Sequence, residues 1–309
     1  MNNTVTILSS LLPVLIMLGV GVICRRYSVF TRAGIDALKK AVVNICLPAV
    51  LINAFATMEY SAANILFSCL MFASCVLAWA LGKACKRFFG ANARFIPFIT
   101  TGFEAGMLGY ALYPLLYGAD KISEFAIFDL GQVLFVFTLY KVLVGLDANE
   151  KQSGRELLRQ MITSPVILAI LAGILLGATG LYAALKPSGV SSIIDACTDF
   201  VSAPTAAMIL IAIGYDLVFS EVSWGITCKA VGLRLAIMLA VRIVLGSIVK
   251  AFGAGSEALN ALTVMCILPP PYVLPVFADD EKQRSFLSST ITVSTLVTIL
   301  GFTVLLFTK

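Results

Sequence analysis

The stretch LNALTVMCILPPPYVLPVFADD, residues Leu259–Asp280, decides the fold that this sequence predicts. Most of it is apolar over about 20 residues, which is the length and composition of a membrane-spanning helix. At its centre, Pro269, Pro270 and Pro271 remove three amide donors and block helical geometry in the residues before them. Unpaired backbone at this depth is tolerated only where it is buried in protein or lines a wet cavity. The stretch therefore predicts a spanning helix that unwinds at mid-depth.

A second apolar stretch, RFIPFITTGFEAGMLGYALYPLLYG at Arg94–Gly118, carries a matching interruption. It concentrates breakers within eight residues, and each glycine weakens a helix by about 1 kcal/mol relative to alanine. They are Gly102, Glu104, Gly106 and Gly109. We expect a break near Thr101–Gly106. Because half-helix N-termini attract anions and unwound carbonyls attract cations, two such breaks predict a binding site. The alternative is that both are simple kinks, since proline and glycine are common in membrane helices.

The rest of the chain has the composition of a membrane protein. Of its 309 residues, 60% are hydrophobic and 13% are charged, against about 25% charged in a soluble domain. A water-soluble globule is therefore excluded. Ten stretches are long and apolar enough to be predicted as spans: Val5–Cys24, Ala41–Met58, Ser61–Gly82, Phe95–Tyr117, Ile122–Gly145, Ile162–Leu185, Ser192–Tyr215, Trp224–Val249, Ala258–Ala278 and Ser285–Thr308.

The basic residues predict the orientation of these spans. Fourteen Lys and Arg residues fall in the loops after odd-numbered spans and four on the other side, so the positive-inside rule places both termini outside. The net charge of +5 is then explained by topology, and no nucleic acid partner is expected. We predict a multi-pass protein of the inner or plasma membrane, in contact with the lipid bilayer.

The longest polar stretch, residues 147–163, divides the chain into two halves of five spans each. An odd number of spans makes the second half, residues 164–309, inverted relative to residues 1–146. Prolines recur at corresponding places, Pro48 in span two and Pro204 in span seven, and both are predicted scaffold hinges. Inverted repeats with interrupted helices are typical of secondary transporters. The predicted fold is an all-α polytopic membrane protein of ten transmembrane helices in two inverted five-helix repeats, forming a single transporter unit over 1–309.

Enzymatic chemistry has few candidate residues. The sequence has no histidine, which excludes Ser-His-Asp catalysis and HExxH zinc sites, and its eight cysteines include no CxxC pair. We expect no enzyme, no metal and no cofactor. An intramembrane aspartyl protease would need two facing aspartates; GYDL at Gly214–Leu217 supplies Asp216, but no GxGD follows.

Ionisable residues within the spans are costly and need a partner or a purpose. Glu104 lies in the first break, where it could bind a coupling cation, carry a proton, or cap the second half-helix. Asp129 and Gln132 share one face of span five, where they are candidates for an ion or proton site; the alternative for Asp129 is a structural hydrogen bond between helices. Arg234, about 15 Å along its helix from Trp224, is too deep to reach water, and we expect it to pair with an acid in preference to drawing an anion.

Several segments together resemble the auxin efflux carrier family of permeases. They are KKAVVNICLPAVLINAF (Lys39–Phe55), TTGFEAGMLGYALYPLLYG (Thr100–Gly118), SPVILAILAGILLG (Ser164–Gly177), SAPTAAMILIAIGYDL (Ser202–Leu217) and ILPPPYVLPVFA (Ile267–Ala278). The resemblance extends over nearly the whole chain in the right order. The short central connection is more similar to that of the bacterial permeases than to that of the plant carriers.

The resemblance implies a transporter of small organic acids such as malate, malonate, lactate or auxin-like acids. Spans one, two, six and seven would form a scaffold, the remaining spans would move as an elevator, and spans four and nine would cross at their breaks. The solute carboxylate would lie beside that crossing. The sequence departs from the family at Glu104, where members commonly have asparagine or threonine, because a carboxylate there repels an anion unless it is protonated or cation-bound.

The predicted site combines the two breaks with one scaffold residue. Substrate-binding residues are Thr100, Thr101, Gly102, Glu104, Gly106, Gly109, Pro269, Pro270, Pro271 and Asn44, and Glu104, Asp129 and Gln132 are the candidates for a proton or coupling ion. We expect a homodimer. Two alternatives remain: a sodium-coupled carrier of the bile-acid-symporter type, and a transport-inactive sensor that uses the same pocket.

Overall fold

The computed structural model describes residues 3–147, 159, 162–217 and 223–308, and among them every regular element is a helix. The all-α prediction is confirmed. The predicted connection at 147–163 lies mostly outside the described residues. The α-helices are α1 (Asn3–Arg26), α2 (Arg32–Ala41), α3 (Leu47–Ala56), α4 (Ala62–Cys85), α5 (Ile96–Ile99), α6 (Tyr110–Tyr117), α7 (Ile122–Phe135), α8 (Lys141–Asp147), α10 (Pro165–Ala178), α11 (Leu181–Ala184), α12 (Val190–Ser202), α13 (Thr205–Asp216), α14 (Trp224–Ala251), α15 (Ser256–Ile267) and α16 (Glu281–Thr308).

Among the described residues, six helical stretches are long and apolar enough to cross a membrane. They correspond to predicted spans one, three, five, seven, eight and ten: Leu8–Arg26, Ala62–Ile99, Ala119–Val144, Val190–Asp216, Trp224–Ala251 and Glu281–Thr308. Two further apolar helices, α10 and α15, are shorter. The chain is therefore a multi-pass membrane protein by the length and composition of its helices.

Prolines account for the divided helices. The predicted second span begins earlier than expected, with α2, whose N-cap Thr31 accepts a hydrogen bond from Gly34 N at 3.1 Å. A π-helical turn, η1 (Val42–Cys46), then leads into α3, where Pro48 occupies the first turn and cannot donate to the helical ladder. Pro204 similarly stands between α12 and α13 as the N-cap of α13. Both predicted hinge prolines thus lie at helix junctions.

Helices from the first half of the chain pack closely against helices from the second half. Helix α1 of the first half packs along α13 of the second, and α10 of the second half packs along α3 of the first. At the α1–α13 contact, a Cβ on Gly21 or Gly214 would clash with the backbone of the opposite helix. Small residues of this kind allow membrane helices to approach closely.

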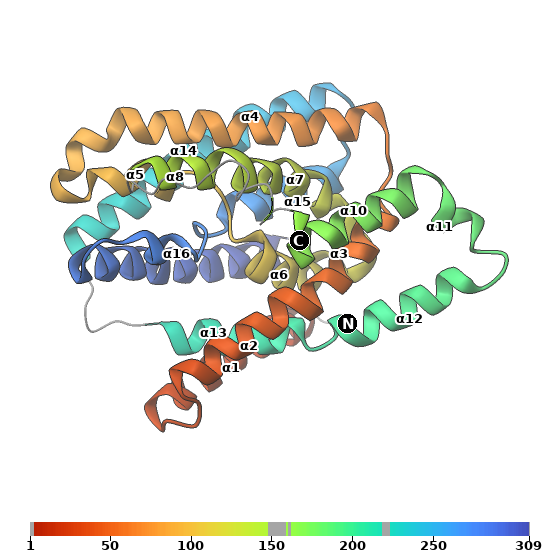
Figure 1. Ribbon diagram of the computed structural model, residues 1–309, viewed down its shortest axis with the longest axis horizontal. Helices are drawn as coiled ribbons and strands as arrows, with labels where there is room; N and C mark the ends of the chain where they lie inside the picture. Colours follow the sequence, from red (N-terminus) through yellow and green to blue (C-terminus); the bar gives the residue numbers. More distant parts are fainter. Residues whose placement is uncertain (1–2, 148–158, 160–161, 218–222, 309) are drawn as a thin grey trace.

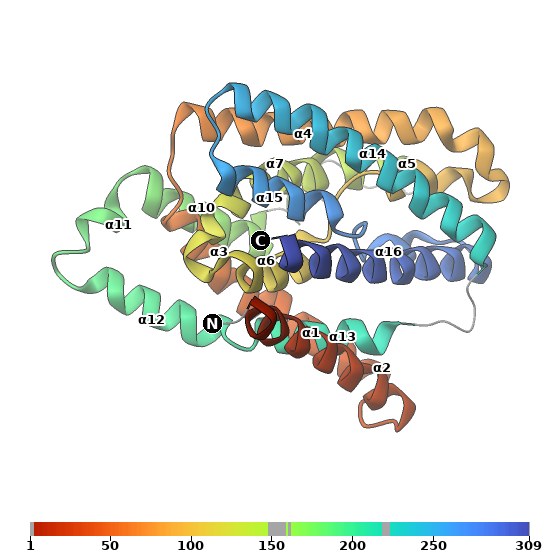
Figure 2. The same cartoon turned by 180° about the vertical axis from the view of Figure 1, so that it is seen from behind.

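The helices form layers that place the two broken segments inside the molecule. In Figures 1 and 2, α4 and α14 lie along one side, α1 and α13 lie along the other, and α16 runs between them. Helix α4 packs on α7, and α15 contacts both α7 and α14. The break between α5 and α6 and the break after α15 are therefore enclosed by other helices, as unpaired backbone at membrane depth requires.

Candidate functional site

The two predicted breaks are observed, and they meet. Residues Thr100–Glu104 separate α5 from the π-helical turn η3 (Ala105–Gly109), which continues into α6, and the chain is again non-helical from Leu268 to Pro271 after α15. The Glu104 amide donates to the Pro269 carbonyl at 3.0 Å and joins one break to the other. The first break therefore begins one residue before the predicted Thr101–Gly106 and ends two residues earlier.

Gly102 allows the two breaks to approach closely. Its φ of +67° lies in the left-handed region, which side chains other than glycine rarely adopt. A Cβ at this position would also lie 3.0 Å from Pro271 Cγ. Both conditions would strain a side chain here, so glycine is favoured where the first break passes the second.

The Glu104 side chain caps the second half of the first broken helix and also reaches the second break. Its Oε1 accepts from the Met107 amide at 3.3 Å, and its Oε2 accepts from the Tyr272 amide at 2.7 Å. Only 9% of the residue is exposed. The carboxylate thus lies where two free backbone amides converge, which is the arrangement that favours an anion. The predicted capping role is observed; a coupling role remains a prediction.

Arg234 on α14 binds backbone carbonyls of both breaks, and the sequence did not predict these partners. Its guanidinium donates to the carbonyls of Ile99 at 2.6 Å, Gly102 at 2.8 Å and Leu268 at 2.9 Å, with a longer contact to the Thr101 carbonyl. The expected acid partner is therefore wrong among the described residues: Arg234 binds the carbonyls that the breaks leave without helical donors. Its depth in span eight was the sequence signal that it has a purpose.

Other predicted site residues surround the breaks without facing open space. The Thr100 hydroxyl donates to backbone carbonyls that include Ile96 at 3.0 Å, and the Thr101 hydroxyl donates to the Cys75 carbonyl at 2.6 Å. Both residues are fully buried. Gly106 faces Leu47 of α3, and Gly109 packs against Phe125 and Leu268. Pro270 is buried between its two neighbours in the second break.

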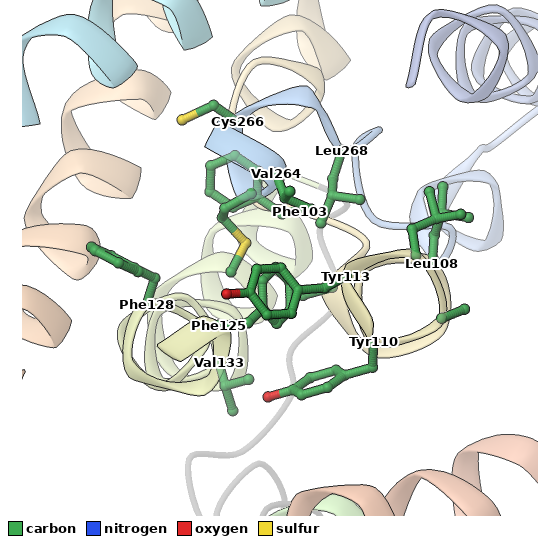
Figure 3. Packing of buried hydrophobic residues seen from close by; sticks show 14 of the residues in the cluster. Phe103, Leu108, Tyr110, Tyr113, Phe125, Phe128, Val133, Val264, Cys266 and Leu268 are labelled. Carbon is green, nitrogen blue, oxygen red and sulfur yellow. The ribbon is translucent and has the colours of Figure 1, made fainter. Parts of the chain in front are cut away.

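An aromatic cluster holds the second half of the first broken helix in place. The rings of Tyr110 and Tyr113 on α6 lie 5.0 and 5.2 Å from the ring of Phe125 on α7. Figure 3 shows these rings beside Leu268 and Phe103, which come from the two breaks. Aromatic contacts of this kind fix α6 against α7 and α15.

Asn44, Asp129 and Gln132 lie apart from the junction of the breaks. Asn44 is exposed, and its side chain donates to the Lys40 carbonyl at 2.9 Å. That carbonyl is not part of the junction of the breaks. Asp129 is buried and accepts from the Tyr110 hydroxyl at 2.9 Å and from Gln132 at 3.2 Å. The bond from Tyr110 joins α6 to α7 and is the structural hydrogen bond between helices that was one of the two expectations for Asp129.

A cavity of about 460 Å³ begins beside the second break. Tyr272 connects it to the junction, because its amide binds Glu104 while its hydroxyl lies 3.0 Å from Thr295 Oγ1. Three basic residues and one acid line the cavity, together with hydroxyls of α16: Arg32, Lys39, Arg284, Asp216, Ser288, Thr292 and Thr295. Its volume is in the range of small-molecule sites, and its excess of basic side chains favours an anion.

Asp216 binds two of these cations. It lies at the C-terminal end of α13, accepts from Arg32 Nη1 at 2.5 Å, and also forms an ion pair with Lys39. Both of its oxygens therefore face basic side chains. This is an ion-pair cluster between α2 and α13 and not the facing pair of aspartates that a protease would need.

A second cavity, of about 290 Å³, is lined by residues of α3, α6 and the junction between α12 and α13. Its lining includes Asn53, Tyr110 and Asp199. Basic residues are absent from this lining, in contrast to the cavity beside Tyr272. Among the described residues, no cluster of histidine, cysteine or acidic side chains could hold a metal ion.

Comparison with known proteins agrees with this arrangement of broken helices. No curated protein sequence matches the chain. The family described as membrane transport protein matches residues 6–306, which is nearly the whole chain. This match confirms the resemblance to the auxin efflux carriers, which are the permeases of that family. The chain belongs to the membrane transport protein family of auxin efflux carrier permeases.

Proposed function

We propose that this membrane transporter is a secondary carrier of small organic acids. The observation that carries the proposal is the buried junction of two broken helices beside a cavity in which three basic residues face one acid. Broken helices at membrane depth are typical of the binding sites of secondary transporters, and the cavity supplies the charge that attracts a carboxylate. A cavity of about 460 Å³ accommodates a molecule of this size.

The proposed architecture is ten transmembrane helices in two inverted repeats. The exchange of partners between α1 and α13 and between α3 and α10 supports it, since the first pair unites spans one and seven and the second unites spans two and six. We assign these four spans to a scaffold and the other six to a mobile unit that moves as an elevator. Both termini then lie outside, and Arg32, Lys39 and Arg284 place the larger cavity on the cytoplasmic side.

Sodium coupling at the junction is disfavoured by Arg234. The carbonyls that a coupling cation would use, those of Ile99, Gly102 and Leu268, already accept hydrogen bonds from its guanidinium. The Arg234 guanidinium therefore uses the carbonyls that a coupling sodium ion would need. Glu104 is the proposed proton-coupling residue, because it is the buried carboxylate at the junction and neutralisation by a proton would lower the cost of its burial.

The test is flux in proteoliposomes loaded with a labelled organic acid. Lactate, malate and malonate are the probes, measured with and without sodium and across pH. Wild-type protein should exchange at least one of them, and replacing sodium by choline should leave the rate unchanged. Specific binding without flux would instead establish a sensor, and flux that requires sodium would favour the bile-acid-symporter type.

A variant at the junction links the flux to the site. A side chain at Gly106, two residues beyond Glu104, would press on Leu47 of the proposed scaffold. Gly106→Val should therefore abolish transport and leave a folded protein. Gly232→Val on α14 is the matched control, because a Cβ there meets no other atom within 4 Å. Full activity of Gly106→Val would refute the assignment of the junction as the transport site.

A further inference from the structure

The junction of the breaks carries its own anion. Each oxygen of Glu104 accepts one backbone amide, Met107 N from the first broken helix and Tyr272 N from the second. A solute carboxylate bound between the half-helices would need these same two donors. Both are already used by a side chain that is 9% exposed and tethered to the backbone.

Whenever Glu104 is ionised, a second carboxylate at this position would meet a like charge in a region of low dielectric. Such pairs repel strongly there, far more than in water. The guanidinium of Arg234 directs its hydrogen bonds to the backbone carbonyls of Ile99, Gly102 and Leu268. The acid group of the solute must therefore bind elsewhere.

The cavity beside Tyr272 offers the alternative donors. Lys39 on α2 and Arg284 on α16 line the cavity from two different helices. Arg32 also lines it and lies about two helical turns before Lys39 on α2. The charged groups that face them are Asp216, which pairs with Arg32 and Lys39, Asp36, which lies 3.6 Å from Arg32, and Glu281, which lies 3.7 Å from Arg284. Within the lining itself, three cations face the single carboxylate of Asp216.

We propose that the acid group of the solute binds to Lys39 and Arg284 in this cavity, and that Glu104 occupies the anion position of the junction in its place. The proposal rests on the proposed organic-acid transport and specifies its site. The other end of the solute then lies against the Tyr272 and Thr295 hydroxyls, next to a buried carboxylate. The preferred solute is a small monocarboxylate whose second end is neutral, such as a hydroxy acid, over a dicarboxylate.

The first test is binding of lactate and malonate to the purified full-length chain in detergent, measured by calorimetry. Lactate should bind more tightly than malonate. Lys39→Gln and Arg284→Gln should each raise the Kd for lactate about 10-fold, the loss expected for one charge-assisted hydrogen bond. Lys40→Gln is the matched control, because Lys40 is the exposed neighbour of Lys39 and does not line the cavity.

The second test removes the carboxylate of Glu104 from the junction of the breaks. Glu104→Ala removes the tethered carboxylate and leaves the amides of Met107 and Tyr272 free, so acetate should raise the melting temperature of this variant. Acetate should have no such effect on Glu104→Gln, in which the amide side chain still fills the position. If Glu104→Ala does not fold, Glu104→Gln alone remains informative, because removal of the negative charge should lower the Kd for lactate.

The outcomes separate this inference from the proposed function. Wild-type affinity in both Lys39→Gln and Arg284→Gln would overturn the inference while organic-acid transport stands. Equal or tighter binding of malonate than lactate would overturn the preferred class of solute. No binding and no flux of any organic acid by the wild-type protein would overturn the proposed function itself.

Discussion

Replacing Arg234 by methionine should destabilise the protein by several kcal/mol. The change keeps a long flexible side chain and removes the donors that bind the carbonyls of Ile99, Gly102 and Leu268 at 2.6–2.9 Å. Each buried acceptor left without a donor costs about 1–3 kcal/mol. The guanidinium is buried, with 2% of the residue exposed, and removing it recovers the cost of taking its charge out of water. This gain offsets part of the loss. We therefore expect a net loss of about 3–5 kcal/mol, typical of removing one member of a buried charged network.

The assay is reversible unfolding of the purified protein in mixed micelles, followed by the loss of helical circular dichroism as the denaturing detergent increases. Arg242→Met is the matched control on the same helix, because Arg242 donates to one partner, Thr263 Oγ1 at 2.6 Å, and is only partly buried. Its loss should cost about 1 kcal/mol. Arg234→Lys should fall between the two, since a single ammonium cannot span both breaks. Equal stability of Arg234→Met and Arg242→Met would refute the view that Arg234 holds the broken helices together.

Three further changes test the packing and the charges of the fold. Gly214→Val should prevent correct folding, because its side chain would collide with the backbone of α1, whereas Gly232→Val should give a monodisperse protein by size-exclusion chromatography. Gly102→Ala should lower the free energy of unfolding by about 1–2 kcal/mol because of its left-handed backbone, and an unchanged value would contradict the strain argument. Glu104→Gln should flatten the pH dependence of transport, and Asp129→Asn should not; the reverse result would move proton coupling to α7.

The broken helices were predictable from the sequence because their causes are local. Three consecutive prolines cannot donate to a helical ladder, and glycines in an apolar stretch lower its helical propensity wherever it lies. Pro48 and Pro204, predicted within spans two and seven, lie in the first turn of α3 and at the N-cap of α13, and their role as hinges stays a prediction. Helix lengths were less predictable. Span two begins at Arg32 and not near Ala41. Its first part, α2, is amphipathic and has a polar face, so an uninterrupted apolar stretch does not mark where it starts.

The partners of the polar site residues could not be predicted, because they are set by tertiary contacts. Arg234 was expected to bind an acid, yet its partners are carbonyls of segments more than 30 residues away along the chain. The hydroxyls of Thr100 and Thr101 turn toward backbone carbonyls, and Asn44 caps a carbonyl of its own helix. Thr100 and Thr101 lie at the first break, whereas Asn44 lies apart from both breaks; the direction of each side chain depends on helices that sequence spacing does not locate.

Glu104 and Arg234 together explain how two broken helices are stable without a bound ligand. The first halves of the helices end in carbonyls, which carry partial negative charge, and a guanidinium binds them. The second halves begin with amides, which carry partial positive charge, and a carboxylate binds them. Both breaks are thus bound by the guanidinium at their carbonyls and by the carboxylate at their amides. The proposed carrier therefore needs no coupling ion to satisfy these backbone groups, and in the proposal above the cavity residues supply its affinity for solute.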